Sequence, residues 1–217
     1  MIPDFTKEQL ATLKLDPNKP LVICDVDEVV VHFTLAFEEF LGKRNLWLEA
    51  ISLALAGNIR SLDTNEPASA ATVNQLIDDF FAERTRTLHP IDGAVEALLE
   101  IGQSNTVVML TNLPHFAKSD RTENLRDLGL FFPVITNSGP KGPAIKHLAS
   151  QTTGPIVFVD DSAGFIQSAN DHAPQVKLVH FLHDERFAKH TPHFDFVSLR
   201  TNSWDFVKPH ILELTRS

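Results

Sequence analysis

The stretch VICDVDEVV, residues 22–30, places three acids, Asp25, Asp27 and Glu28, inside an otherwise apolar run. A short run rich in Val and Ile, without alternation of polar residues, is typical of a strand that is buried on both faces. Charged side chains are costly in such surroundings unless something pairs with them. The stretch therefore predicts a buried strand at LVIC (21–24) that ends at a functional site containing these acids.

Five further short apolar runs follow this one, and helical patterns lie between them. The runs are TVVML (106–110), PVIT (133–136), PIVFV (155–159), VKLVHFL (176–182) and the weaker FDFVSL (194–199). The helical patterns are HPIDGAVEALLEIGQ (89–103), KSDRTENLRDLGL (118–130), KGPAIKHLAS (141–150) and SAGFIQSANDHA (162–173). Strands that alternate with helices predict a Rossmann-like, doubly wound α/β fold, with a mostly parallel sheet and helices on both faces.

Residues 33–88 interrupt the alternation, because they contain no apolar run of the buried-strand kind. HFTLAFEEFLGKRNLWLEAISLALAG (32–57) and ATVNQLIDDFFAERT (71–85) have apolar residues at helical spacing, and GNIRSLDTNEPAS between them is turn-rich and suits a small hairpin or a loop. We predict a core domain of residues 1–32 and 89–217, with a small helical cap of residues 33–88 inserted after the first strand. Such an insert lies over the carboxyl ends of the strands, where open α/β sheets bind ligands.

Polar residues occupy the ends of several predicted strands. They are Asp25 and Asp27 after the first, Thr111 and Asn112 after the second, Asp160 and Asp161 after the fourth, and Lys141 at the start of the helix after the third. In a parallel sheet these residues converge on one edge. Carboxylates held so close repel one another by several kcal/mol at an effective dielectric of about 20, so a metal ion and the Lys141 ammonium should lie among them. Carboxylate ligands without Cys or His favour Mg²⁺, which in turn indicates phosphate chemistry.

Composition excludes several classes of function. The 217 residues carry a net charge of −9 without a basic cluster, which argues against nucleic-acid binding. Cys24 is the only cysteine, so an intrachain disulfide is impossible. The sequence shows no signal-peptide pattern and no apolar run of about 18 residues. We expect a soluble cytoplasmic protein without a nucleic-acid or membrane partner, and no oligomeric state is predicted.

Four segments together resemble the motifs of the haloacid dehalogenase (HAD) superfamily, in the order that this family has them. They are DVDEVV (25–30), LTN (110–112), Lys141 in KGPAIKHL, and FVDDS (158–162). The resemblance spans about residues 20–182, and the insert stands where members carry a helical C1-type cap. It implies a Mg²⁺-dependent phosphatase that hydrolyses a small phosphorylated metabolite, a phosphomonoester, through an aspartyl-phosphate intermediate.

The resemblance also implies a role for each motif residue. Asp25 would be the nucleophile and a metal ligand, and Asp27 would be the general acid and base and lend its backbone carbonyl to the metal. Asp160 would bind the metal directly, with Asp161 close by or bound through water. The phosphoryl oxygens would be held by Thr111, the backbone of Asn112 and Lys141.

Glu28 departs from the family pattern, because most members have Gly after the second Asp. Glycine adopts backbone conformations that other residues adopt only at a cost, so a catalytically degenerate phosphate-binding module stays open as an alternative. A phosphomutase and a phosphonate hydrolase of the same superfamily are further alternatives. The phosphonate hydrolase normally needs a lysine in the cap, and Lys43 is the only lysine of residues 33–88. A receiver domain is disfavoured, because its acidic pair precedes the phosphorylated Asp.

Overall fold

The computed structural model describes residues 1–51 and 55–216. Its centre is a six-stranded sheet in which all described neighbouring strands run parallel. In spatial order the strands are β5 (Val134–Thr136), β4 (Thr106–Thr111), β1 (Leu21–Cys24), β6 (Ile156–Asp160), β7 (Lys177–Phe181) and β8 (Leu199–Thr201). The chain builds outward on one side of β1 and then on the other, so the order reverses between β1 and β6. The predicted doubly wound α/β fold is confirmed.

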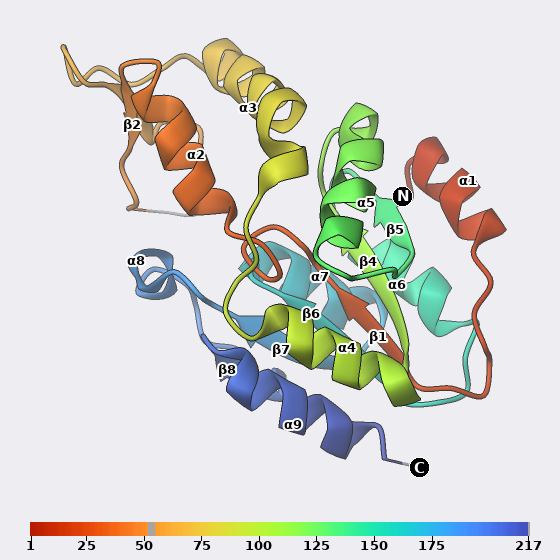
Figure 1. The fold of residues 1–217 in the computed structure, drawn as a ribbon. Coiled ribbons are helices and arrows are strands. Elements are labelled where there is room, and N and C mark those ends of the chain that lie inside the picture. Colours follow the sequence, from red (N-terminus) through yellow and green to blue (C-terminus); the bar gives the residue numbers. More distant parts are fainter. Residues whose placement is uncertain (52–54, 217) are drawn as a thin grey trace.

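Helices cover both faces of the sheet (Figure 1). Successive residues of a strand point to opposite faces, so Val22 and Cys24 of β1 enter one apolar core while Leu21 and Ile23 enter the other. The first core is covered by α4 (Ala94–Ser104), α5 (Lys118–Asp127) and α9 (Trp204–Leu214), and the second by α1 (Asp4–Thr12), α6 (Gly142–Ala149) and α7 (Ala163–His172). No helix in the described ranges is both long and apolar enough to cross a membrane.

Five of the six predicted strands match observed strands to within one residue at each end. The sixth prediction, FDFVSL at 194–199, is wrong except at Leu199, because β8 spans Leu199–Thr201. Its residues are all only partly buried, as expected for a strand at the edge of the sheet. An edge strand pairs on one side only and need not be apolar, so its position is not visible as an apolar run.

Residues 33–88, here termed the insert, lie to one side of the sheet (Figure 1). They form α2 (Phe33–Gly42), an antiparallel hairpin of β2 (Leu46–Leu48) and β3 (Ile59–Ser61), α3 (Ala70–Arg84) and the 3-10 turn Thr85–Thr87. Among the described residues, the helical prediction for 32–57 is therefore correct only at Phe33–Gly42, and Leu46–Leu48 form a strand instead. Residues 52–54 of that prediction lie outside the described ranges. Pairing with β3 stabilises β2, and helical periodicity does not reveal that contact.

Five phenylalanines hold α2 and α3 together. Their ring centroids lie 5.1 to 6.0 Å apart in stacked, tilted and edge-on pairs. Aromatic pairs in these arrangements contribute beyond the area that they bury. The residues are Phe33, Phe37 and Phe40 on α2, and Phe80 and Phe81 on α3.

The two connections between the insert and the sheet are hydrogen-bonded to each other. The His32 N–H donates to the carbonyl of His89 at 3.0 Å, and the Ile91 N–H donates to the carbonyl of Val30 at 2.8 Å. Val31 and Pro90 form an antiparallel bridge between these two bonds. The chain thus leaves and rejoins the core through one short ladder.

Candidate active site

The acids at the strand ends meet at the carboxyl edge of the sheet. Asp25 directly follows β1, and Asp160 ends β6, so the two flank the point where the strand order reverses. In open α/β sheets this point forms the ligand crevice. One carboxylate oxygen from each of Asp25, Asp160 and Asp161 lies within 4.8 Å of the other two. The chain therefore brings together three acids that are up to 136 positions apart in sequence.

Lys141 supplies a positive charge between two of these acids. It is the N-cap residue of α6 and fully buried, and its Nζ lies 2.6 Å from Oδ2 of Asp160 and 2.8 Å from Oδ1 of Asp25. The contact with Asp160 is a hydrogen bond, whereas the contact with Asp25 has ion-pair distance without hydrogen-bond geometry. Burial acts to lower the pKa of Lys141, but attraction to Asp160 and Asp25 outweighs burial and raises the pKa above its ordinary value. The ammonium therefore stays charged.

A close contact between α6 and α7 fixes the position of Lys141. A Cβ atom at the next residue, Gly142, would lie 2.1 Å from the backbone oxygen of Ser168 on α7. The Gly142 N–H also donates to Oγ of Ser168 at 3.1 Å. Only glycine permits this approach, so the two helices hold Lys141 at a set distance from β6.

Asp161 is the acid without a cation. No ion pair found in residues 1–51 and 55–216 includes it, and burial, followed by repulsion from Asp160 and Asp25, raises the pKa of its carboxyl well above the ordinary value. Lys141 compensates for only part of the negative charge. Three converging carboxylates suit a hard cation such as Mg²⁺, so the residues present fit this metal. The predicted contribution of Asp27 to the metal is its backbone carbonyl, and this stays a prediction.

Asp27 lies beside these acids and pairs with a different cation. Oδ1 of Asp27 accepts a hydrogen bond from the guanidinium of Arg121, a fully buried residue on α5. Its other oxygen lies 3.5 Å from Oγ1 of the buried Thr111 at the end of β4. Burial raises the pKa of Asp27 and Arg121 opposes that rise, with a net pKa above the ordinary value. A carboxyl with a raised pKa can hold a proton nearer to neutral pH.

Arg121 extends this contact toward the insert. Its second terminal nitrogen lies 3.4 Å from Oδ1 of Asn124, whose amide nitrogen donates to the carbonyls of Arg86 at 3.2 Å and Leu88 at 2.9 Å. The last two residues belong to the segment that returns from the insert. Two side chains thus link Asp27 to that segment.

Comparisons with known proteins bear on the fold alone. No family model matches the sequence, and no curated protein matches it at a significant level. Solved structures do match. A HAD family hydrolase from Deinococcus radiodurans R1, with bound phosphate and sodium, has a TM-score of 0.59 at 17% identity, covering 93% of this chain and 100% of the other. The chain has the HAD-like fold.

Two further HAD-like structures resemble it to the same degree. YfnB of Bacillus subtilis, described as a HAD-hydrolase and bound to magnesium, has a TM-score of 0.59 at 15% identity, with 89% of this chain and 99% of the other covered. A predicted phosphoglycolate phosphatase from Haemophilus somnus 129PT has a TM-score of 0.57 at 14% identity, with 91% and 100% covered. Both matches extend over nearly the whole length of each chain.

Glu28, the departure from the HAD motif, adopts the conformation that favours glycine. Its φ is +60°, in the left-handed region where a side chain is disfavoured. Its carboxylate accepts a hydrogen bond from the backbone N–H of Thr34 at 2.7 Å, in the first turn of α2. A negative charge at a helix N-terminus is favourable. Glu28 thus ties its backbone position to the first helix of the insert, although burial outweighs this hydrogen bond and raises the pKa of the Glu28 carboxyl above its ordinary value.

The acids at the sheet edge line a cavity of about 320 Å³ to which the insert also contributes residues. Thr111 and Asn112 line the cavity together with Asp25 and Asp27. The amide nitrogen of Asn112 donates to the carbonyl of Gly139 at 2.8 Å, and its oxygen accepts from Asn137 at 2.9 Å. The loop that precedes Lys141 therefore holds the Asn112 side chain.

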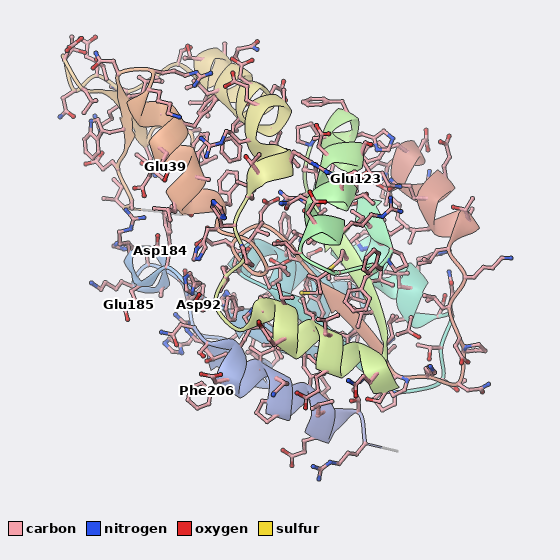
Figure 2. The ribbon with its side chains drawn as sticks, in the orientation of Figure 1. Glu39, Asp92, Glu123, Asp184, Glu185 and Phe206 are labelled. Atoms are coloured by element: carbon pink, nitrogen blue, oxygen red, sulfur yellow. The ribbon has the colours of Figure 1, made fainter. Side chains whose placement is uncertain are left out.

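The short helix α8 (Glu185–Ala188) closes one side of the cavity. Arg186 on this helix pairs with Glu38 of α2 at 2.7 Å and with Asp184 at 2.7 Å. Figure 2 shows Asp184 beside α8. Since Asp184 and Phe187 both line the cavity, this segment joins the core to the insert at the edge of the site.

Sequence analysis missed Arg121, although a signal for it exists. Arg121 and Leu125 stand at i and i+4 in the helical pattern, on one face of α5. A charged residue in line with the apolar face of a helix is a candidate for a buried ion pair. Its partner could not be identified from that pattern.

Proposed function

We propose that the chain is a Mg²⁺-dependent phosphatase that hydrolyses a small phosphomonoester through an aspartyl-phosphate at Asp25. The observation that carries this proposal is the charge arrangement at the sheet edge. Lys141 lies between Asp25 and Asp160, and Asp161 next to them has no cation of its own. The HAD-like fold supports it, as do the neighbours described with bound phosphate, with magnesium and as a phosphoglycolate phosphatase.

In the first half of the reaction, a carboxylate oxygen of Asp25 attacks phosphorus and the bond to the ester oxygen breaks. Asp27 gives its proton to that departing oxygen. In the second half, Asp27 takes a proton from the water that attacks the aspartyl-phosphate, which regenerates Asp25 and releases phosphate. The raised pKa of Asp27 suits a group that must hold a proton and then accept one.

The remaining residues position and stabilise charge. Lys141, Thr111 and the Asn112 backbone would hold the phosphoryl oxygens, which carry most of the negative charge. Mg²⁺, held by Asp25, Asp160 and Asp161, would neutralise further charge on the phosphoryl group when bound. Arg121 does not line the cavity and acts through Asp27, whose carboxylate it orients.

The insert fits the role of a cap in this proposal. We divide the chain into a core of residues 1–32 and 89–217 and a cap of residues 33–88, because both parts contribute residues to one cavity. Lys43 is exposed and does not line the cavity. A phosphonate hydrolase that forms a Schiff base in the cap therefore has no support here.

Phosphate release tests the proposal directly. With Mg²⁺, the protein should release phosphate from p-nitrophenyl phosphate, and EDTA should abolish release. Asp25→Asn should lower the rate by about a thousandfold or more, because the nucleophile is lost. Asp171→Asn, an exposed position on α7, is the control and should leave the rate unchanged. A folded, Mg²⁺-loaded protein that is inert toward a broad panel of phosphomonoesters would overturn the proposal.

A further inference from the structure

Much of the cavity wall is apolar. Eight of the residues that line the cavity are hydrophobic, and they come from both the insert and the core. They are Phe33, Leu48, Leu55, Ile77 and Phe81 from the insert, and Phe165, Leu182 and Phe187 from the core. In ligand sites, apolar walls of this kind contact the apolar part of a ligand, and a few polar groups fix its orientation.

The polar residues of the cavity fall into two groups. Those at the sheet edge serve the phosphoryl group in the proposed function. Of the others, Glu28 accepts from the Thr34 N–H, and Asp184 accepts from the backbone and the guanidinium of Arg186. Nδ1 of His183 lies 3.5 Å from the carbonyl oxygen of Asn202. Each of these side chains thus already has a partner within the chain. A sugar hydroxyl buried against the apolar walls would lose its bonds to water without gaining new ones.

The charged residues of the cavity wall also favour an uncharged ligand. Within the part of the chain that the structure describes, the cavity wall includes no lysine or arginine. A second anionic group on the substrate would instead meet the carboxyls of Glu28 and Asp184. Such a group would be repelled by these carboxyls and would lose its hydration. His183, a wall residue able to carry a positive charge, already attracts the same two carboxyls.

We propose that the substrate's leaving group is an uncharged, apolar alcohol, such as an alkyl or aryl alcohol, held between the insert and the sheet edge. This inference rests on the proposed phosphatase function and adds the class of substrate to it. The volume of about 320 Å³ lies at the small end of ligand cavities, so the apolar part is small. Sugar phosphates and phosphorylated acids are correspondingly poor substrates.

A homologous series of alkyl phosphates tests the inference with constant chemistry. Each methylene that enters the apolar part of the cavity should raise kcat/KM about three- to fourfold from ethyl to hexyl phosphate, until the cavity is full. 2-Phosphoglycolate adds a carboxylate to a short ester and should be a poorer substrate than ethyl phosphate. A flat series, or a preference for 2-phosphoglycolate or glucose 6-phosphate, would overturn the inference.

A pair of lysine substitutions on α3 locates the effect. Ile77→Lys places a cation in the apolar wall, so it should reduce the hexyl-to-ethyl ratio of kcat/KM and raise activity toward 2-phosphoglycolate. Asn74→Lys adds the same charge at an exposed position of α3 that does not line the cavity, and should leave both ratios unchanged. Equal effects of the two variants would contradict the assigned wall.

Binding of alkylphosphonates separates this inference from the proposed function. Calorimetric titration of the Mg²⁺-loaded protein with ethyl-, butyl- and hexylphosphonate needs no turnover. Affinity should rise along the series, and phosphonoacetate should bind more weakly than ethylphosphonate. If no phosphomonoester is hydrolysed but this order holds, the phosphatase proposal fails and the apolar site stands. If phosphate is released but the order is absent, the substrate class is wrong.

Discussion

The two sides of the cavity, here termed the floor and the roof, differ in chemical character. The floor lies at the carboxyl edge of the sheet and holds buried charges, with Lys141 between Asp25 and Asp160 and Arg121 beside Asp27. The roof comes largely from the insert and is made of side chains such as Leu48 and Phe81. The difference separates two tasks: the floor is suited to act on a phosphoryl group, and the roof to select what is attached to it.

The two regions also differ in how they respond to substitution. Removing one member of a buried ion pair leaves the other charge uncompensated in a low-dielectric environment. Removing a methylene from an apolar wall costs only its transfer free energy and the packing around it. Variants of the floor should therefore lose stability and activity together, whereas variants of the roof should mainly change which ester is preferred.

The largest effect should come from Lys141→Met. Without Mg²⁺ this change leaves Asp25 and Asp160 facing each other without a cation, and it should lower the free energy of unfolding by about 3–5 kcal/mol. Urea unfolding with and without Mg²⁺ measures it, and Mg²⁺ should restore part of the loss. Lys146→Met, at an exposed position of α6, should change stability by less than about 0.5 kcal/mol. Equal urea midpoints for the two variants would contradict the assigned charge balance.

Replacing Arg121 should have the next largest effect, through Asp27. Arg121→Met should lower kcat by roughly tenfold to a hundredfold, because the acid loses its orienting partner. Arg121 lowers the pKa of Asp27, so without it that pKa rises. The limb of the pH-rate profile that follows the protonation of Asp27 should therefore move to higher pH.

Two comparisons keep this prediction specific. Arg121→Lys retains a cation and should shift the limb less, and Arg126→Met, at an exposed position of α5, should not shift it. A merely structural role for Arg121 would lower stability and leave the limb where it is.

The smallest effect should come from the contact at the edge of the roof. Arg186→Gln removes the ion pair with Glu38, and the Arg186 side chain is 47% exposed. Exposed ion pairs contribute little to stability, so the free energy of unfolding, measured by thermal unfolding, should change by less than about 1 kcal/mol. Phosphate release should change less than about fivefold, and the difference from wild type should disappear in about 1 M salt. A loss as large as that of Lys141→Met would remove the distinction between floor and roof.

The sheet could be predicted from the sequence because its strands are buried on both faces. Runs such as LVIC and PIVFV are fully apolar for that reason. The convergence of Asp25 and Asp160 follows from the same pattern, since parallel strands place their carboxyl ends at one edge. β8 escaped prediction because an edge strand does not require an apolar run.

Features that depend on tertiary partners could not be predicted. β2 exists because it pairs with β3, although its apolar residues also fit a helical pattern. Arg121 lies in line with Leu125 on α5, which marks it as a candidate buried charge, but nothing in the stretch KSDRTENLRD identifies Asp27 as its partner. The role of Glu28 was equally hidden, because its partner, the Thr34 N–H, is recognisable only when the start of α2 is placed.

The ladder between the two connections of the insert has an evolutionary consequence. Because Val30 bonds to Ile91 and His32 bonds to His89, the chain closes on itself below residues 33–88. A tight hairpin turn could join the two arms of this ladder in place of residues 33–88. Nature could thus exchange, enlarge or delete the whole module without cutting a strand of the sheet, so new substrate preferences can be acquired while the catalytic scaffold is inherited intact.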